Sequence, residues 1–177
     1  MPSSVTNLNP ESLITTNVNV KVIGTTDIFT DSNIGTLGDL NNSTGADFEN
    51  NTTLGFTIED FQLGVGESVT GVEVFVNYAT GTKSSLILKG TTNNSLALED
   101  FPQIGTYEGP PANNISFGNL GLTNVTDINN LRLSLFVSTE AGISEIRVAV
   151  TILSLSGGKV KLPKGKIILR GGKISLT

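Results

Sequence analysis

The fold is decided by a stretch late in the chain that reads Glu145-Ile146-Arg147-Val148-Ala149-Val150-Thr151-Ile152. Its large apolar residues fall at every second position, and polar or small residues fill the places between them. Successive side chains of a β-strand point to opposite faces, so this pattern is typical of a strand with one buried face. The stretch therefore predicts a strand that packs one face against a core and turns the other outward.

The same alternation returns elsewhere in the chain. The series are Val18, Val20 and Val22; Leu54, Phe56 and Ile58; Val72, Val74, Val76 and Tyr78; and Leu131, Leu133, Leu135 and Val137. Clusters of Asn, Asp, Ser, Thr, Gly and Pro separate them, as turns would. Helical patterning is nearly lacking, with one short turn indicated at Asn9–Glu11 and another at Thr126–Ile128. We therefore predict an all-β protein, an antiparallel two-sheet β-sandwich of jelly-roll type with a C-terminal tail of short strands.

The chain divides into three parts by composition. Residues 1–16 are predicted to form an N-terminal arm, for which Pro2 and Pro10 suit an extended strap. Residues 17–156 form the predicted sandwich domain, with a long surface loop over about 24–53 that is rich in Asp, Asn, Thr and Gly. Residues 157–177 form a basic tail with a β repeat. Loops as long as the one predicted here are usually functional or disordered.

Composition excludes several kinds of chemistry. The 177 residues include no Cys, His or Trp. This rules out a disulfide framework, zinc and haem sites with their usual ligands, and Ser–His or Cys–His catalytic pairs. Adjacent acids such as Glu59-Asp60 and Glu99-Asp100 would point to opposite faces of a strand and would not converge on one glycosidic bond. We predict a protein that is not an enzyme and uses no cofactor.

Charge is strongly segregated along the chain. Residues 1–157 hold all 16 acidic residues and five of the 11 basic ones, whereas residues 158–177 hold six basic residues and no acid. The tail also repeats a unit, Gly-Lys-(Val/Ile)-x-Leu, at 158–162, 165–169 and 172–176. Glycine and β-branched residues disfavour a helix here, so we predict three short strands. Such strands bury too little surface to be ordered alone and need a partner.

The partner-binding residues predicted on the tail are its six bases: Lys159, Lys161, Lys164, Lys166, Arg170 and Lys173. Solubilising lysines on a solvated tail are the alternative. We predict no nucleic-acid partner because the body is acidic and has only two tyrosines. No membrane partner is predicted either, since no segment has the roughly 18 uninterrupted apolar residues that span a bilayer. The start of the chain shows no secretory signal, which predicts synthesis without export.

Two weaker site predictions concern the body. Asp27, Asp31 and Asp39 are candidate calcium ligands in the long loop, although aspartates that cap Asx-turns explain the same pattern. Tyr78 and Tyr107 are candidate sugar contacts, joined by Phe75, because a jelly-roll can present aromatic residues on a concave face. The alternative is that these aromatic residues belong to the core.

Three runs of sequence resemble small β-sandwich virion proteins of tailed bacteriophages. They are Glu67-Ser68-Val69-Thr70-Gly71-Val72-Glu73-Val74-Phe75-Val76, Thr126-Asp127-Ile128-Asn129-Asn130-Leu131-Arg132-Leu133, and Glu145-Ile146-Arg147-Val148-Ala149-Val150-Thr151. With the strand expected at Leu86-Ile87-Leu88, the resemblance spans about residues 54–155. It implies a structural subunit and transfers no catalytic residue.

Two roles follow from this resemblance. A capsid decoration (cement) protein would sit on the outer capsid surface of the virion, after synthesis in the host cytoplasm, as a homotrimer that binds the major capsid protein or other virion proteins. A tail-fibre or baseplate component would use the tail repeat in a trimeric spine, and the sandwich to touch the host surface. Carbohydrate binding for host attachment is a related alternative. We expect the first role.

Overall fold

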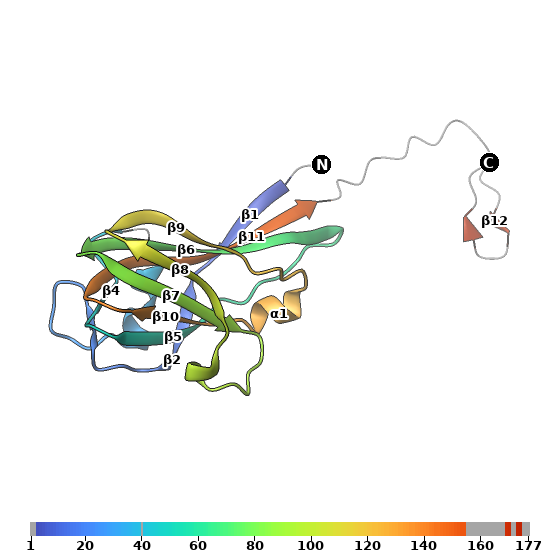
Figure 1. The fold of residues 1–177 in the computed structure, drawn as a ribbon. Helices are drawn as coiled ribbons and strands as arrows, with labels where there is room; N and C mark the ends of the chain where they lie inside the picture. Colours follow the sequence, from blue (N-terminus) through green and yellow to red (C-terminus); the bar gives the residue numbers. More distant parts are fainter. Residues whose placement is uncertain (1–2, 40, 155–168, 171–172, 175–177) are drawn as a thin grey trace.

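The computed structural model describes residues 3–39, 41–154, 169–170 and 173–174, and it forms a sandwich of two antiparallel sheets (Figure 1). We name the sheets A and B. Sheet A has the strand order β3 (Val20–Val22), β4 (Ala46–Phe48), β11 (Ala141–Ser154), β6 (Glu67–Gly81) and β9 (Ala112–Asn119), and β1 (Ser3–Leu8) also pairs with β11. Sheet B has the order β2 (Pro10–Thr15), β5 (Thr52–Ile58), β10 (Arg132–Val137), β7 (Ser84–Thr91) and β8 (Gln103–Gly109). The predicted all-β two-sheet sandwich is confirmed.

The pairing of strands β4 to β11 is that of a jelly-roll. β4 pairs with β11, β5 with β10, β6 with β9 and β7 with β8, all antiparallel. The chain thus runs as one long hairpin, with its turn between β7 and β8, and this hairpin is rolled so that its strand pairs fall alternately into sheets A and B. This arrangement agrees with the jelly-roll type expected from the spacing of the strands.

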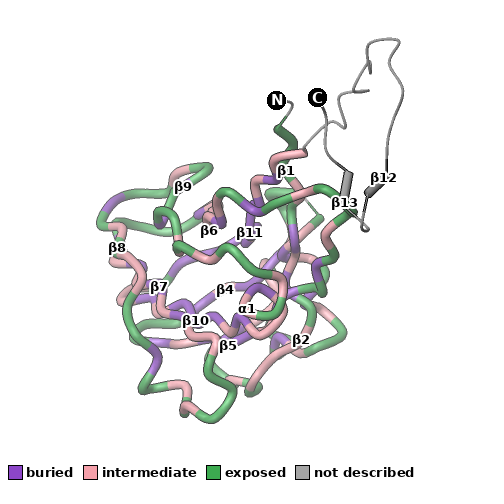
Figure 2. Tube along the Cα trace, turned by 90° about the vertical axis from the view of Figure 1, so that its right-hand side faces the viewer, coloured by how far each residue is buried: buried purple, intermediate pink, exposed green. Residues whose placement is uncertain are grey.

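The alternation of apolar residues builds the core. Ile146, Val148 and Val150 of β11 are fully buried between the sheets, opposite Val76, Val74 and Val72 of β6. Figure 2 shows how buried and more exposed positions follow one another along the strands. The core is continuous from Leu8 and Val20 through to Ile152.

The N-terminal segment is part of the sandwich, so the prediction of a separate arm over residues 1–16 is wrong for the residues described. β1 pairs with β11, and β2 pairs with β5 on the other sheet. The chain crosses between the sheets at Asn9, where a helical turn was expected. Leu8 and Pro10 on either side of Asn9 are both buried. A segment with so few core residues gives no long alternation, which explains the wrong expectation.

The predicted long loop over residues 24–53 is also wrong in its extent. It contains the 3-10 helix η1 (Asp31–Leu37), the strand β4 and the first two residues of β5. Phe29, Ile34 and Leu37 are buried in the core. Single apolar residues separated by polar ones hold this segment against the body, so it packs on the sandwich and does not stand away from it.

Two further short helices occur. The helix α1 (Val125–Asn129) confirms the turn predicted at Thr126–Ile128, and the Asn124 side chain caps it by accepting a hydrogen bond from the Asp127 backbone N–H at 2.8 Å. The 3-10 helix η2 (Leu98–Asp100) lies between β7 and β8. In the tail, β12 (Leu169–Arg170) and β13 (Lys173–Ile174) pair as an antiparallel hairpin. The first unit of the tail repeat lies outside the described residues.

Candidate functional site

The predicted tail residues can be placed only in part. Lys159, Lys161, Lys164 and Lys166 lie outside the described residues. Arg170 and Lys173 are backbone partners across the β12–β13 hairpin. The hairpin agrees with the short strands expected of the repeat, and the role of these bases in partner binding stays a prediction.

Tyr78 is a core residue, which contradicts its prediction as a sugar contact. Its side chain is 1% exposed, and its hydroxyl donates a hydrogen bond to the Thr82 carbonyl. Burial, with a smaller contribution from nearby Tyr107, raises the pKa of Tyr78 above its ordinary value. Tyr107 is half-buried against the core and donates to the Pro110 carbonyl at 2.7 Å. The two tyrosines therefore do not form an exposed aromatic platform.

The three candidate calcium ligands do not gather into a site. Asp31 accepts a hydrogen bond from the Leu13 backbone N–H at 2.6 Å, which ties η1 to β2. Asp39 accepts from the Asn41 N–H at 2.8 Å and from the Thr44 hydroxyl, as in a capped turn. Among the described residues, no group of three or more acidic side chains could hold a metal ion. Local Asx capping explains Asp39, and the hydrogen bond to β2 gives Asp31 a structural role, so both are explained better without calcium binding.

One end of the sandwich is extended by strands of sheet A. β6 and β11 have 15 and 14 residues, whereas the strands of sheet B have six to eight. β1 continues alongside β11 at this end, with Ser3 opposite Leu153 (Figure 1). Val5 of β1 is 59% exposed. The first residue of β1 and the last residues of β11 therefore lie at the same end of the sandwich.

The outer face of sheet A carries a buried ion pair. Glu145 is 4% exposed, and its carboxylate lies 3.4 Å from the Arg147 guanidinium and accepts a hydrogen bond from the Asn77 amide. Arg147 also donates to Asn114 Oδ1 at 2.6 Å and lies over the Phe75 ring, 4.8 Å from its centroid. These contacts join β11, β6 and the edge strand β9. Their groups mostly satisfy one another, so the network is best explained as a structural clamp on β9.

The outer face of sheet B carries a hollow that we call the sheet B groove. Its volume is about 410 Å³, within the roughly 300–1,000 Å³ usual for small-molecule sites. The lining residues come from the three inner strands and from η2: Thr53, Ile87, Lys89, Leu98, Glu99, Ser134 and Phe136. Sequence reasoning did not find this groove.

Strand register arranges the floor of the groove in two rows. Thr53, Phe136 and Ile87 stand opposite one another on β5, β10 and β7. Two residues further along these strands, Gly55, Ser134 and Lys89 form the second row. The first row is partly exposed and supplies an aromatic ring, an aliphatic side chain and a hydroxyl.

A bridge made by residues 94–101 crosses the second row. The Arg132 guanidinium donates to the Leu96 carbonyl at 2.9 Å and lies 5.0 Å from the centroid of the Phe101 ring. The Lys89 ammonium donates to the Glu99 carbonyl at 3.3 Å. Leu98 occupies the space above Gly55. Two cations on neighbouring strands thus hold the bridge against the sheet.

Ser134 is the unusual member of this site. It is 1% exposed, and its hydroxyl has no hydrogen-bond partner in the described structure. The great majority of buried polar side-chain atoms in proteins have a partner. Ser134 lies under the bridge, at the inner end of the groove. Its neighbour on β5 is Gly55, which has no side chain. This hydroxyl therefore has unused hydrogen-bonding capacity, which a group in the groove can reach once the side chain that covers it shifts.

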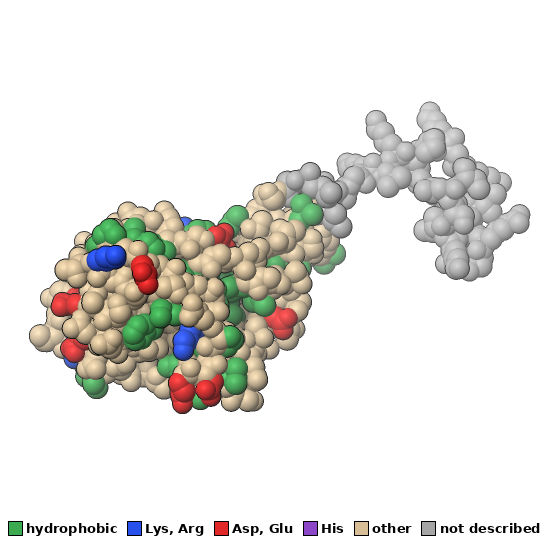
Figure 3. Space-filling model, viewed as in Figure 1, with side chains coloured by type: hydrophobic (Ala, Val, Ile, Leu, Met, Phe, Trp, Pro, Cys, Tyr) green, Lys and Arg blue, Asp and Glu red, His purple; other side chains and the backbone are tan. Residues whose placement is uncertain are grey.

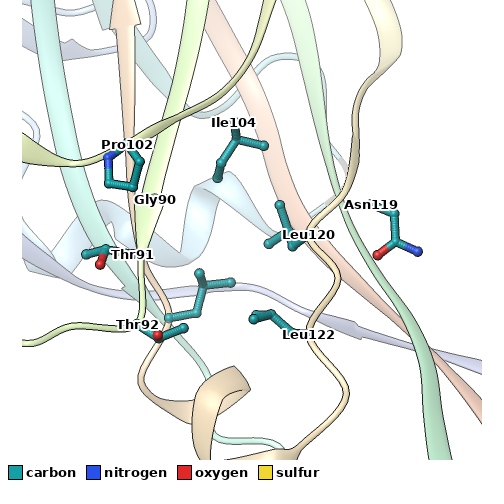
Figure 4. Close-up of a pocket in the computed structure, with 9 residues that line it drawn as sticks. Gly90, Thr91, Thr92, Pro102, Ile104, Asn119, Leu120 and Leu122 are labelled. Carbon is teal, nitrogen blue, oxygen red and sulfur yellow. The ribbon is translucent and has the colours of Figure 1, made fainter.

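A second hollow, also about 410 Å³, opens where β8 of sheet B meets the segment after β9. Figure 4 shows Ile104, Leu120 and Leu122 pointing into it, while the Asn119 amide points away. Its apolar lining continues the core, and the Asn119 oxygen already accepts from the Gly121 N–H at 2.8 Å. Thr91 and Thr92 also line this hollow, but among the described residues none of its side chains is a buried polar group without a partner, in contrast to Ser134 in the sheet B groove.

The surface of the body is poor in charge. Figure 3 shows one face, on which acidic and basic side chains are few and lie singly or in small groups. No protein-family model matches the sequence, and no curated protein matches it. None of the helices among the described residues is long and apolar enough to cross a membrane. Functional inference therefore rests on the sandwich, its extended end and the sheet B groove.

Proposed function

We propose that the protein is a non-enzymatic structural protein of a bacteriophage virion, and that it decorates the outer surface of the capsid. The observation that carries the proposal is the pairing of Ser3 with Leu153. It places Ser3 and Leu153 at one end of the jelly-roll, and the sequence that follows β11 contains the basic residues of 158–177. An acidic body with a basic segment at one end has the polarity needed for oriented docking.

The edge of β1 supports the same role. Among the described strands β1 pairs only with β11, so its other edge has unpaired backbone groups. The strand reads Ser3-Ser4-Val5-Thr6-Asn7-Leu8 and has none of the charged residues that usually protect an exposed edge. A strand from a neighbouring subunit can add to such an edge. We propose that the protein acts as a homotrimer and binds the major capsid protein or other virion proteins through this end.

A second candidate role is a trimeric tail-fibre or baseplate component, or a carbohydrate-binding module, that attaches the virion to its host. The sheet B groove favours this candidate, because it combines the aromatic ring of Phe136 with polar side chains on the outer face of sheet B. A decoration protein that only stabilises a shell has no need of such a groove.

Copy number separates the two roles. Purified virions of the phage that encodes the protein are analysed by quantitative mass spectrometry, with the major capsid protein as the internal standard. A ratio comparable to that of the capsid protein supports decoration, and added protein should then raise the melting temperature of emptied heads. A ratio comparable to that of tail proteins supports the second role. If the protein is missing from virions, both roles are wrong.

A further inference from the structure

The sheet B groove has the features of a built site. Its floor belongs to β5, β10 and β7, which are the inner strands of sheet B, and its wall is the bridge held by Arg132 and Lys89. The η2 segment of this bridge buries no residue of its own. Phe101 at the end of the bridge is buried and anchors it, whereas the η2 segment lies on the surface of the sheet and forms the wall of the groove.

We infer that the sheet B groove binds a neutral pyranose residue of a glycan. This inference deepens the second candidate role and does not depend on capsid decoration. Phe136 and Ile87 offer an apolar surface to one face of the sugar ring, while the Thr53 hydroxyl lies in the same row. A sugar ring has an apolar face and hydroxyl groups at its rim, which matches this combination.

The unpartnered Ser134 hydroxyl identifies the polar contact. A serine hydroxyl both donates and accepts, so it pairs well with another hydroxyl. A sugar that lies on Phe136 can direct a ring hydroxyl toward the inner end of the groove, where Ser134 lies. Leu98 covers Gly55 directly beside Ser134, so this side chain has to shift for the bond to form. The shift is feasible because Leu98 is only partly buried on a short 3-10 turn.

Other ligand classes fit less well. An extended peptide binds to sheets mainly through backbone groups at an open edge, but the backbone groups on the floor of the groove are already paired within sheet B. An anionic sugar would lie close to Glu99, and the Lys89 ammonium already donates to a backbone carbonyl. A neutral hydroxylated ligand is not repelled by Glu99 and does not need Lys89 to give up its hydrogen bond.

The test uses the purified full-length chain and saturation-transfer NMR with the methyl glycosides of glucose, galactose, mannose and N-acetylglucosamine. We expect binding of at least one of them. Ser134→Ala should weaken this binding by about tenfold, as for one lost hydrogen bond in a buried site. The matched control is Ser85→Ala, which removes a hydroxyl from β7 outside the groove and should leave the affinity unchanged.

Thermal melting separates loss of binding from loss of structure. Ser134→Ala should melt at the wild-type temperature or above it, because it removes a buried hydroxyl that has no partner. A clearly lower melting temperature would show that this hydroxyl has a structural partner and would overturn the inference. Three further results would overturn the inference. They are that none of the four glycosides binds, that Ser134→Ala binds as tightly as the wild type, or that the anionic sugar sialic acid binds more tightly than the neutral glycosides. None of these outcomes bears on capsid decoration, which the copy number tests.

Discussion

The Leu98 side chain fills the space that a side chain at Gly55 would need. A Cβ atom added to Gly55 would lie 2.4 Å from Leu98 Cδ1, well inside van der Waals contact. Gly55 lies within a regular strand and has no left-handed backbone conformation. The space above Gly55 is thus taken by a neighbouring side chain, and the backbone of Gly55 itself does not call for glycine. This contact joins the bridge of residues 94–101 to the centre of sheet B.

We predict that Gly55→Ala displaces Leu98 and loosens the bridge. Overpacking of this kind costs about 1–3 kcal/mol in the free energy of unfolding, which urea denaturation would measure. Hydrogen exchange should increase in the bridge while the core of β6 and β11 stays protected. Adding Leu98→Ala to this variant removes the clash and should recover part of the loss. If the double variant is as unstable as the sum of the single variants, the two residues are not coupled.

We also predict that the N-terminal strand contributes to global stability. Leu8 is 4% exposed in the core, so Leu8→Ala should lower the free energy of unfolding by about 2–5 kcal/mol. Val5 lies in the same strand but is 59% exposed, and Val5→Ala should change stability by less than about 0.5 kcal/mol. Urea denaturation of both variants makes the comparison. Equal, negligible effects would indicate a free arm.

Because its side chain is buried, Tyr78 should make the folded protein less stable at alkaline pH. Burial favours the neutral phenol, so the pKa of Tyr78 is higher in the folded state than in the unfolded state. Below the unfolded pKa, about 10, both states hold the proton and stability does not change. Above it the unfolded state loses its proton first, so the free energy of unfolding falls until the folded phenol titrates.

The variant Tyr78→Phe isolates this effect. It loses the hydrogen bond to the Thr82 carbonyl, which should cost about 1 kcal/mol at neutral pH. Its stability should then fall less than that of the wild type between neutral pH and pH values above about 10. Urea denaturation at several pH values provides the measurement. Parallel pH profiles for the two proteins would rule out Tyr78 as the source of the alkaline loss.

The proposed docking of the basic tail predicts a dependence on charge. Replacing all six bases of residues 158–177 by glutamine should weaken attachment to virion particles, and added salt should weaken the wild type in the same direction. Co-sedimentation with purified particles measures both effects. The control replaces Lys21 and Lys83 of the body by glutamine and should bind as the wild type does. Unchanged binding of the tail variant would remove the tail from the proposed interface.

Sequence patterns predicted the strands that lie inside the sheets and missed most of those at their margins. The long alternations of β6, β10 and β11 arise because each strand packs a whole face against the core. β1 buries only Leu8, and β8 buries only Gly109, so neither gives a sustained period. A strand of this kind forms because a neighbour offers its backbone groups, and that cause leaves little trace in the strand's own sequence.

The groove was beyond sequence reasoning for a related reason. Gly55, Ser134 and Lys89 become neighbours only through the register of β5, β10 and β7. The alternation in β10 does place Ser134 on the outer face, where a hydroxyl normally meets water. Its burial depends on a bridge from another part of the chain, whose position no local pattern indicates.

The rolled hairpin also has a consequence for how the protein is made. β11 lies at the centre of sheet A, between β6 on one side and β4 and β1 on the other, yet it is the last strand of the sandwich to be synthesised. A ribosome therefore releases β1, β4 and β6 before the strand that joins them exists. Sheet B depends less on the end of the chain, because β7 and β8 are adjacent hairpin strands. Folding during synthesis should begin there and should reach the native state only after residue 154 has emerged.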